Sequence, residues 1–253
     1  MSTEESSLVK QEGVEKEMSF LAHLEELRWR IIYSLIGVVV GAILSWIFID
    51  FLINNILLVP AEKAKISLQN LKPFGQLFLY IQVAIMTGIV LSIPNLFYQL
   101  WKFIAPALEA NEKKYVNRIV IFSSFCFITG IVFAYYIMLP VTLQFAGEFG
   151  TEAIENNFAV SEYFTIIISV MLAAGVIFEL PMLSFFLSKL GILTPEFMRK
   201  YRRHAIVIIM ILAAILSPGA DPVAQVLLAI PLTVLYEVSI FVSKTVQKKK
   251  LES

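Results

Sequence analysis

Charged side chains are concentrated in residues 19–30, with the sequence SFLAHLEELRWR, where they could hold a charged ligand. At helical spacing His23, Glu26 and Arg30 lie on one face, and Ser19 can cap the helix. The adjoining face is an apolar stripe formed by Phe20, Leu24, Leu27 and Ile31. Such a cluster of polar side chains is a candidate functional site. Spacing alone favours a plainer interpretation, an amphipathic helix with a solvated Glu26–Arg30 pair.

A second charged segment, residues 103–114 with the sequence FIAPALEANEKK, follows the second long apolar stretch. Its carboxylates, Glu109 and Glu112, lie on a face otherwise dominated by positive charge. The alternative is a solvated helix in which Glu109 pairs with Lys113.

Glu179 lies inside an apolar stretch, GVIFELP, with no basic residue three or four positions away. A carboxyl group within a membrane span is expensive and marks a candidate functional site. Removal from water favours its neutral form, which can donate a hydrogen bond. The alternative is a neutral acid bonded to a neighbouring helix. Glu237 in the last stretch is similar, and Asp221 and Gln225 form a polar spot near the turn before it, where Asp221 could simply cap a helix.

The remaining side chains argue against an enzyme. Cys126 is the only cysteine and the two histidines, His23 and His204, are far apart, so we expect no metal site and no cofactor. Serine-hydrolase and zinc-protease motifs are missing, as is a paired intramembrane aspartate set, so an intramembrane hydrolase ranks last. The net charge of zero gives no reason to expect nucleic acid as a partner.

The elements that carry these residues are apolar stretches of membrane-spanning length. Hydrophobic residues make up 58% of the 253 positions and charged residues 16%. The predicted spans are residues 31–53, 74–101, 119–146, 163–190, 205–217 and 223–243. In lipid they must be helices, so we predict an all-α membrane protein of six spans. Prolines 94, 140, 181 and 231 should kink four of them into a concave bundle.

The last two stretches form a short helical hairpin. Residues 205–217 and 223–236 are each about 10 Å shorter than the hydrocarbon core. The hairpin could be re-entrant, or it could span and thin the membrane. Basic residues at both outer ends favour spanning.

The distribution of Lys and Arg predicts orientation. With the N-terminus inside, 17 of the 20 basic residues lie on the cytoplasmic side. We therefore predict an inner-membrane protein with both termini in the cytoplasm. Residues 1–18 form a polar tail without a cleavable signal, 19–243 the transmembrane domain, and 244–253 a basic tail. On the outer side, residues 60–73 should include a short interfacial helix.

Four phrases together resemble the TatC family, the polytopic subunit of the twin-arginine protein translocase. They are HLEELRWR, YQLWKFIAPALEANEKK, GVIFELP and SPGADPVAQVLLAIPLTVLYE, in family order, and the resemblance runs from about Phe20 to Val242. It implies a receptor that binds the Arg-Arg signal peptides of folded proteins on the cytoplasmic face. It also implies a scaffold that assembles with single-span partners of the TatA and TatB type in an oligomeric complex driven by the proton-motive force.

The resemblance also implies roles for residues. The signal-peptide site matches Glu26 and Glu112, supported by His23, Arg28, Phe103, Pro106 and Leu108. Positions within the membrane or facing partners match Glu179, Gln225, Asp221 and Glu237. Glu109 departs from the family pattern. The alternative function is a proton-coupled secondary transporter with Glu179 as carrier, which should show repeat symmetry, and we find no internal repeat.

Overall fold

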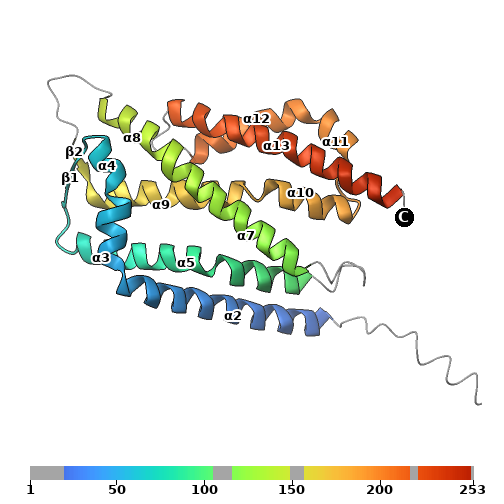
Figure 1. The fold of residues 1–253 in the computed structure, drawn as a ribbon, viewed down its shortest axis with the longest axis horizontal. Coiled ribbons are helices and arrows are strands. Elements are labelled where there is room, and N and C mark those ends of the chain that lie inside the picture. Colours follow the sequence, from blue (N-terminus) through green and yellow to red (C-terminus); the bar gives the residue numbers. More distant parts are fainter. Residues whose placement is uncertain (1–19, 105–115, 149–156, 217–221, 252–253) are drawn as a thin grey trace, which may run out of the picture.

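A computed structural model describes residues 20–104, 116–148, 157–216 and 222–251, which form a helical bundle with a small strand pair (Figure 1). The first half contains α2 (Phe20–Ile47), α3 (Ile49–Leu52), the π-helix η1 (Ile53–Leu57), α4 (Val59–Lys63), β1 (Ser67–Gln69) and α5 (Gly75–Ile104). The second contains α7 (Val116–Phe133), the π-helix η3 (Ala134–Met138), α8 (Leu139–Glu148), β2 (Asn157–Ala159), α9 (Val160–Ile177), α10 (Leu180–Lys189), α11 (Pro195–Lys200), α12 (Arg202–Leu216) and α13 (Pro222–Leu251).

Five helical stretches are long and apolar enough to cross a membrane. They cover residues 23–47, 75–104, 116–148, 160–189 and 228–247. Helix α12 is the remaining apolar helix of the expected six, and its 15 residues extend about 22 Å. The predicted all-helical membrane fold is confirmed, with α12 short as the sequence indicated.

Helix α13 is longer than the apolar segment from which it was predicted. It continues for 30 residues, through Glu237 and past Lys244, to Leu251. Polar residues do not end a helix as long as its backbone hydrogen bonds continue. Helix α13 also packs along both α10 and α12. Only the α12 arm of the final hairpin is therefore short.

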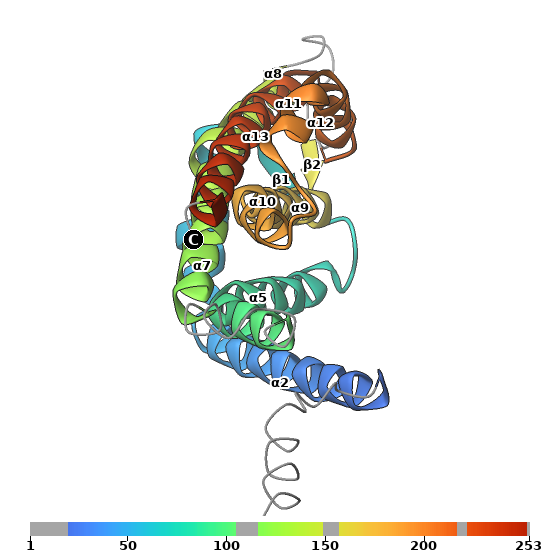
Figure 2. The ribbon, with the colours of Figure 1, turned by 90° about the vertical axis from the view of Figure 1, so that its right-hand side faces the viewer.

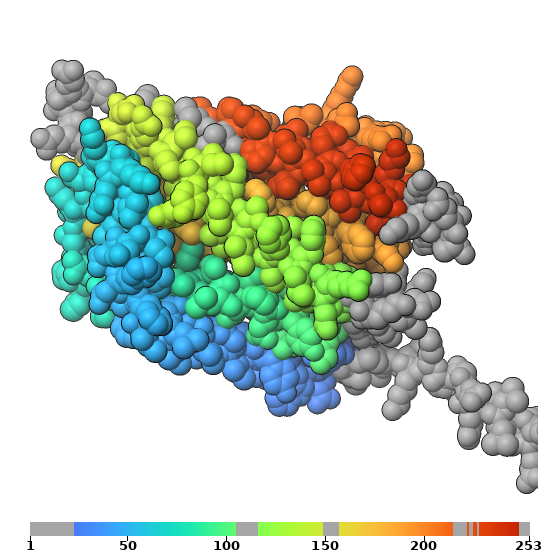
Figure 3. Space-filling view, in the orientation of Figure 1, coloured from blue at the N-terminus to red at the C-terminus, as the bar shows by residue number. Residues whose placement is uncertain are grey.

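The helices follow an arc when the bundle is viewed from its end (Figure 2). Helices α2 and α5 lie at one extreme, α12 and α13 lie at the other, and α9 and α10 lie between them. Helix α7 crosses the face of the bundle nearest the viewer, between α5 and α13 (Figure 3). The buried core lies where α5, η3 and α9 come together, around Val83, Ala134 and Ile167.

The two ends of the bundle differ in charge. The starts of α2 and α7 and the ends of α5, α10 and α13 lie at the same end (Figure 1). We call it the basic end, because these elements and α11 carry Arg28, Lys102, Arg118, Lys189, Lys200 and Lys244. The opposite end carries α4, β1 and β2, and we call it the strand end.

Glycines allow α2 and α5 to pack closely. A Cβ atom on Gly88 would lie 2.5 Å from the backbone nitrogen of Ala42, and one on Gly41 would lie 2.6 Å from the carbonyl oxygen of Gly88. Ser92 of α5 donates a 2.6 Å hydrogen bond to the carbonyl of Gly37. Small residues that bring backbones together are a common basis of helix association in lipid. This contact fixes the register of α2 against α5.

Replacing Gly88 with alanine is expected to destabilise the protein by about 1–3 kcal/mol, because the added methyl group meets backbone atoms that cannot move independently. Thermal unfolding in detergent measures the effect. Gly147→Ala is the matched control, since a Cβ there meets its nearest atom at 3.5 Å. Equal unfolding temperatures for the two variants would contradict the tight packing described above.

Two of the four prolines lie at helix interruptions. The π-helix η3 comes directly before α8, whose second residue is Pro140, and Pro181 lies in the first turn of α10 after α9 has ended at Ile177. A proline has no N–H to donate to the preceding turn, which disfavours an uninterrupted helix. Helices α5 and α13 continue through Pro94 and Pro231 without a break.

The strand end ties the segment between α3 and α5 to the segment that precedes α9. Helix α4 supplies the short helix expected in residues 60–73, and β1 and β2 form a parallel pair that the sequence did not predict. Tyr163 of α9 donates a 2.7 Å hydrogen bond to the carbonyl of Leu57 and accepts a 3.1 Å bond from the N–H of Ala61. Tyr135 donates a 2.8 Å bond to the carbonyl of Ile56. These contacts join α4 and η1 to the second half of the chain.

Candidate functional site

The start of α2 and the end of α5 meet at the basic end, which brings part of the two charged segments together. The rings of His23 and Phe103 stack with centroids 4.3 Å apart and an angle of 19° between their planes. The antiparallel packing of α2 on α5 places these residues side by side, although 80 positions separate them in the sequence.

Glu26 takes part in a chain of polar side chains that extends from α2 to α5. Its Oε1 accepts a 2.7 Å bond from Nη2 of Arg30, so the predicted ion pair is confirmed. Nη1 of Arg30 donates to Oε1 of Gln99 at 3.3 Å, and Nε2 of Gln99 donates to Oδ1 of Asn95 at 3.3 Å. Asn95 donates in turn to the carbonyl of Tyr33 at 3.2 Å. We call Glu26, Arg30, Gln99 and Asn95 the Glu26 network.

The ion pair is less exposed than the solvated surface pair that the sequence suggested. The side chains of Arg30 and Glu26 keep only 17% and 21% of their surface exposed. The Nε of Arg30 is buried and has no hydrogen-bond partner among the residues that the structure describes. A charge-assisted bond shielded in this way is stronger than one in open water. Glu26 is therefore a carboxylate that already holds one guanidinium.

Sequence reasoning missed Gln99 and Asn95, although a signal was present. Positions 95, 99 and 103 are spaced four apart along α5 and lie on one helix face. Two amides one helical turn apart near the end of α5 could have marked the face that meets α2.

The other residues expected at this site are only partly placed. Arg28 is exposed, and its guanidinium lies 5.3 Å from the ring centroid of Trp29, a cation–π contact within α2. Pro106, Leu108 and Glu112 lie outside the described residues, as does Glu109. Their positions relative to Glu26 stay predictions.

Glu179 lies at the junction of α9 and α10 and is 8% exposed. Its carboxyl group faces Ser123 and the backbone of Phe127 on α7. A Cβ on Gly175 would meet the Phe127 ring at 2.7 Å, so α7 and α9 pack tightly here. Oε1 of Glu179 and Oγ of Ser123 are buried, and neither makes a well-formed hydrogen bond to a described residue. A buried acid with unused bonding capacity can accept a partner's donor or hold a proton.

The polar residues of the final hairpin make contacts within the chain. Glu237 forms an exposed ion pair with Arg202 at the start of α12, with Nη2 and Oε2 2.8 Å apart. Nε2 of Gln225 donates to the carbonyl of Met210 at 3.1 Å, again from α13 to α12. The sequence did not predict the pair of Glu237 with Arg202, because a pairing between two helices leaves no local signal. Asp221 lies outside the described residues.

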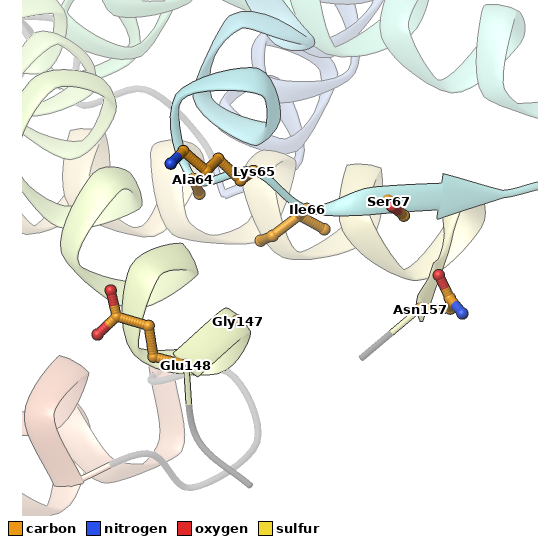
Figure 4. A pocket seen from close by; sticks show the side chains of 7 residues that line it. All are labelled: Ala64, Lys65, Ile66, Ser67, Gly147, Glu148 and Asn157. Atoms are coloured by element: carbon orange, nitrogen blue, oxygen red, sulfur yellow. The ribbon is translucent and has the colours of Figure 1, made fainter. Parts of the chain in front are cut away.

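The described residues contain no candidate metal cluster, and a pocket at the strand end is open. No three His, Cys, Asp or Glu side chains there lie close enough to hold a metal ion. An open pocket at the strand end contains none of the residues singled out above (Figure 4). It is lined by Ala64, Lys65, Ile66, Ser67, Gly147, Glu148 and Asn157.

Comparison with known proteins gives consistent matches along the chain. A family model described as Sec-independent protein translocase protein (TatC) matches residues 22–231. The TatC protein of Carboxydothermus hydrogenoformans is 35% identical over 236 residues, which cover 93% of this chain and 97% of that protein. The TatC protein of Aquifex aeolicus is 36% identical over 239 residues, which cover 93% of this chain and 98% of that protein. A crystal structure described as "Twin Arginine Translocase Receptor- TatC" has a TM-score of 0.77 and 35% identity, covering 89% of this chain and 99% of that one.

Proposed function

The chain belongs to the TatC family of Sec-independent protein translocase proteins, and we propose that within the translocase it is the receptor for Arg-Arg signal peptides of folded proteins. It is a multi-pass membrane protein that takes part in protein transport, and several of its helices are apolar and long enough to span a membrane. The observation that carries the proposal is the Glu26 carboxylate, which holds a guanidinium at 2.7 Å beside the basic end of the bundle.

The chemistry of Glu26 suits arginine better than lysine. A guanidinium is planar and presents five donors in a fork that matches a carboxylate, whereas the ammonium of lysine acts as a single point of charge. Its location on a cation-rich end also disfavours segments with only a general positive charge, because basic neighbours repel them. An acidic position within such a surface selects a ligand that can form directed bonds.

A second carboxylate would account for the second arginine of the pair. Glu112 is proposed for this role, with Pro106 and Leu108 beside it, and with His23, Arg28 and Phe103 forming the surface near Glu26. The stacked pair of His23 and Phe103 supports a flat contact surface next to the acid. The apolar part of a signal peptide would then lie along the inner side of the arc.

Orientation and partners follow from the same proposal. The basic end would face the cytoplasm, with both termini on that side of the inner membrane. The reason is that the cytoplasmic loops of membrane proteins carry an excess of Lys and Arg. Glu179, Gln225, Asp221 and Glu237 are proposed contacts for single-span TatA- and TatB-type helices in an oligomeric complex. Hydrogen bonds of this kind between helices in lipid contribute about 1–2 kcal/mol.

A cross-linking map tests the receptor role. An Arg-Arg signal peptide with a photoreactive group is added to the isolated protein and compared with its Lys-Lys version. We expect the Arg-Arg peptide to label residues 23–30 and 99–104, and the Lys-Lys peptide to label them weakly. Equal labelling by the two peptides would show that these carboxylates do not select arginine.

A further inference from the structure

We infer that Arg30 competes with the signal peptide for Glu26, so that an incoming arginine must displace an arginine of the receptor itself. The inference rests on the proposed receptor function and adds a residue that sets the affinity of that site. The observation behind it is that the carboxylate proposed to receive the peptide is already occupied, with Nη2 of Arg30 2.7 Å from Oε1 of Glu26.

The remaining contacts of Arg30 make this occupation exchangeable. The bond from Nη1 to Gln99 is 3.3 Å long, beyond the usual range for an N–H···O bond, and the buried Nε makes none to the described residues. Arg30 is therefore held mainly by Glu26. If Glu26 turns to a ligand, Arg30 keeps Gln99 as an acceptor, and Asn95 lies next to Gln99 in the same network.

Displacement by an arginine replaces one guanidinium with another. The carboxylate loses no charge-assisted bond in the exchange, and the released Arg30 keeps part of its hydrogen bonding. A lysine of the peptide must also displace Arg30, but it then forms fewer directed hydrogen bonds with Glu26 than an arginine does. A competitor lowers the affinity of all cationic ligands by a common factor. Weak ligands then fall below useful affinity, while an arginine pair remains bound.

The experiment measures the binding of fluorescent Arg-Arg and Lys-Lys signal peptides to the purified full-length protein by anisotropy. Arg30→Gln removes the competing charge, and we expect both peptides to bind roughly tenfold more tightly, the value of about one charge-assisted bond. Arg30→Lys keeps the charge but loses the fork, so its affinities should fall between those of the wild type and Arg30→Gln. The ratio between the two peptides should change little.

A double-mutant cycle separates competition from a structural role. In a Glu26→Gln background, Arg30→Gln should no longer raise affinity, because the group for which Arg30 competes is absent. Arg203→Gln, which removes one positive charge from an exposed residue at the start of α12, serves as the charge-matched control and should leave affinity unchanged.

The possible outcomes are distinct. If Arg30→Gln weakens or does not alter binding of the Arg-Arg peptide, Arg30 positions Glu26 or is uninvolved, and the competition inference is wrong. If Arg203→Gln gives the same gain, the effect is general charge and the inference is again wrong. If the wild-type protein binds the Arg-Arg peptide without dependence on Glu26, the proposed receptor site itself fails, whatever Arg30 does.

Discussion

Replacing Glu26 with alanine is expected to abolish cross-linking of an Arg-Arg signal peptide while the protein stays folded, and Glu112→Ala is expected to do the same. Each substitution removes one carboxylate that would accept hydrogen bonds from a guanidinium of the peptide. A hydrogen bond to a charged group contributes about 1.5–3 kcal/mol, which corresponds to roughly tenfold to a hundredfold in affinity. The measurement is photo-cross-linking to the purified protein, with thermal unfolding in detergent as the check on folding.

Glu25 provides a matched control for this experiment. It is the preceding residue of α2, it carries the same carboxylate, and it is exposed. One residue corresponds to about 100° around a helix, so its side chain points away from that of Glu26. Glu25→Ala should preserve cross-linking. Persistence of the cross-link in both Glu26→Ala and Glu112→Ala would mean that the signal peptide binds elsewhere.

Glu179→Ala is expected to reduce export strongly, and Glu179→Gln is expected to retain more activity than alanine. The side chain is buried at the junction of α9 and α10, where glutamine keeps both the volume and a hydrogen-bond donor. Loss of a bond of about 1–2 kcal/mol to a partner helix corresponds to a roughly five- to thirtyfold effect. The measurement is export of a folded reporter with an Arg-Arg signal peptide in membrane vesicles.

The comparison between glutamine and alanine also distinguishes two mechanisms. A hydrogen-bonding role tolerates glutamine, whereas a proton-carrying role does not, because an amide does not titrate in this range. Equal loss in the two variants would contradict a hydrogen-bonding role and favour proton transfer. Glu162→Ala, at the exposed first turn of α9, is the control and should leave export unchanged.

The sequence predicted those features that depend on local pattern. Long apolar stretches gave the helices, because a backbone in lipid must form its own hydrogen bonds. Spacing of four residues gave the Glu26–Arg30 pair, and the rarity of acids in apolar stretches marked Glu179 as buried. Pro181 pointed to the interruption between α9 and α10. Each of these signals lies within a few residues of the feature it predicts.

Features that depend on how distant segments align were not predictable in this way. The bond from Arg30 to Gln99 requires the register of α2 on α5, which is set by the close approach at Gly41 and Gly88. Likewise Glu237 pairs with Arg202 because α12 and α13 are antiparallel neighbours, not because of their sequence spacing. The three-residue strands are too short to show an alternating pattern.

The contacts at the strand end have a mechanical consequence. The parallel pair of β1 and β2, together with the tyrosine bonds to η1 and α4, fastens the first half of the chain to the second at that end. At the other end α2 rests mainly on α5. Helix α5 is itself held at that end, where the buried Trp101 packs against Phe186 of α10 with ring centroids 5.1 Å apart. A force applied to the tip of α2 would therefore act first on the contact between α2 and α5, because α2 packs mainly on α5 while α5 is held at both ends.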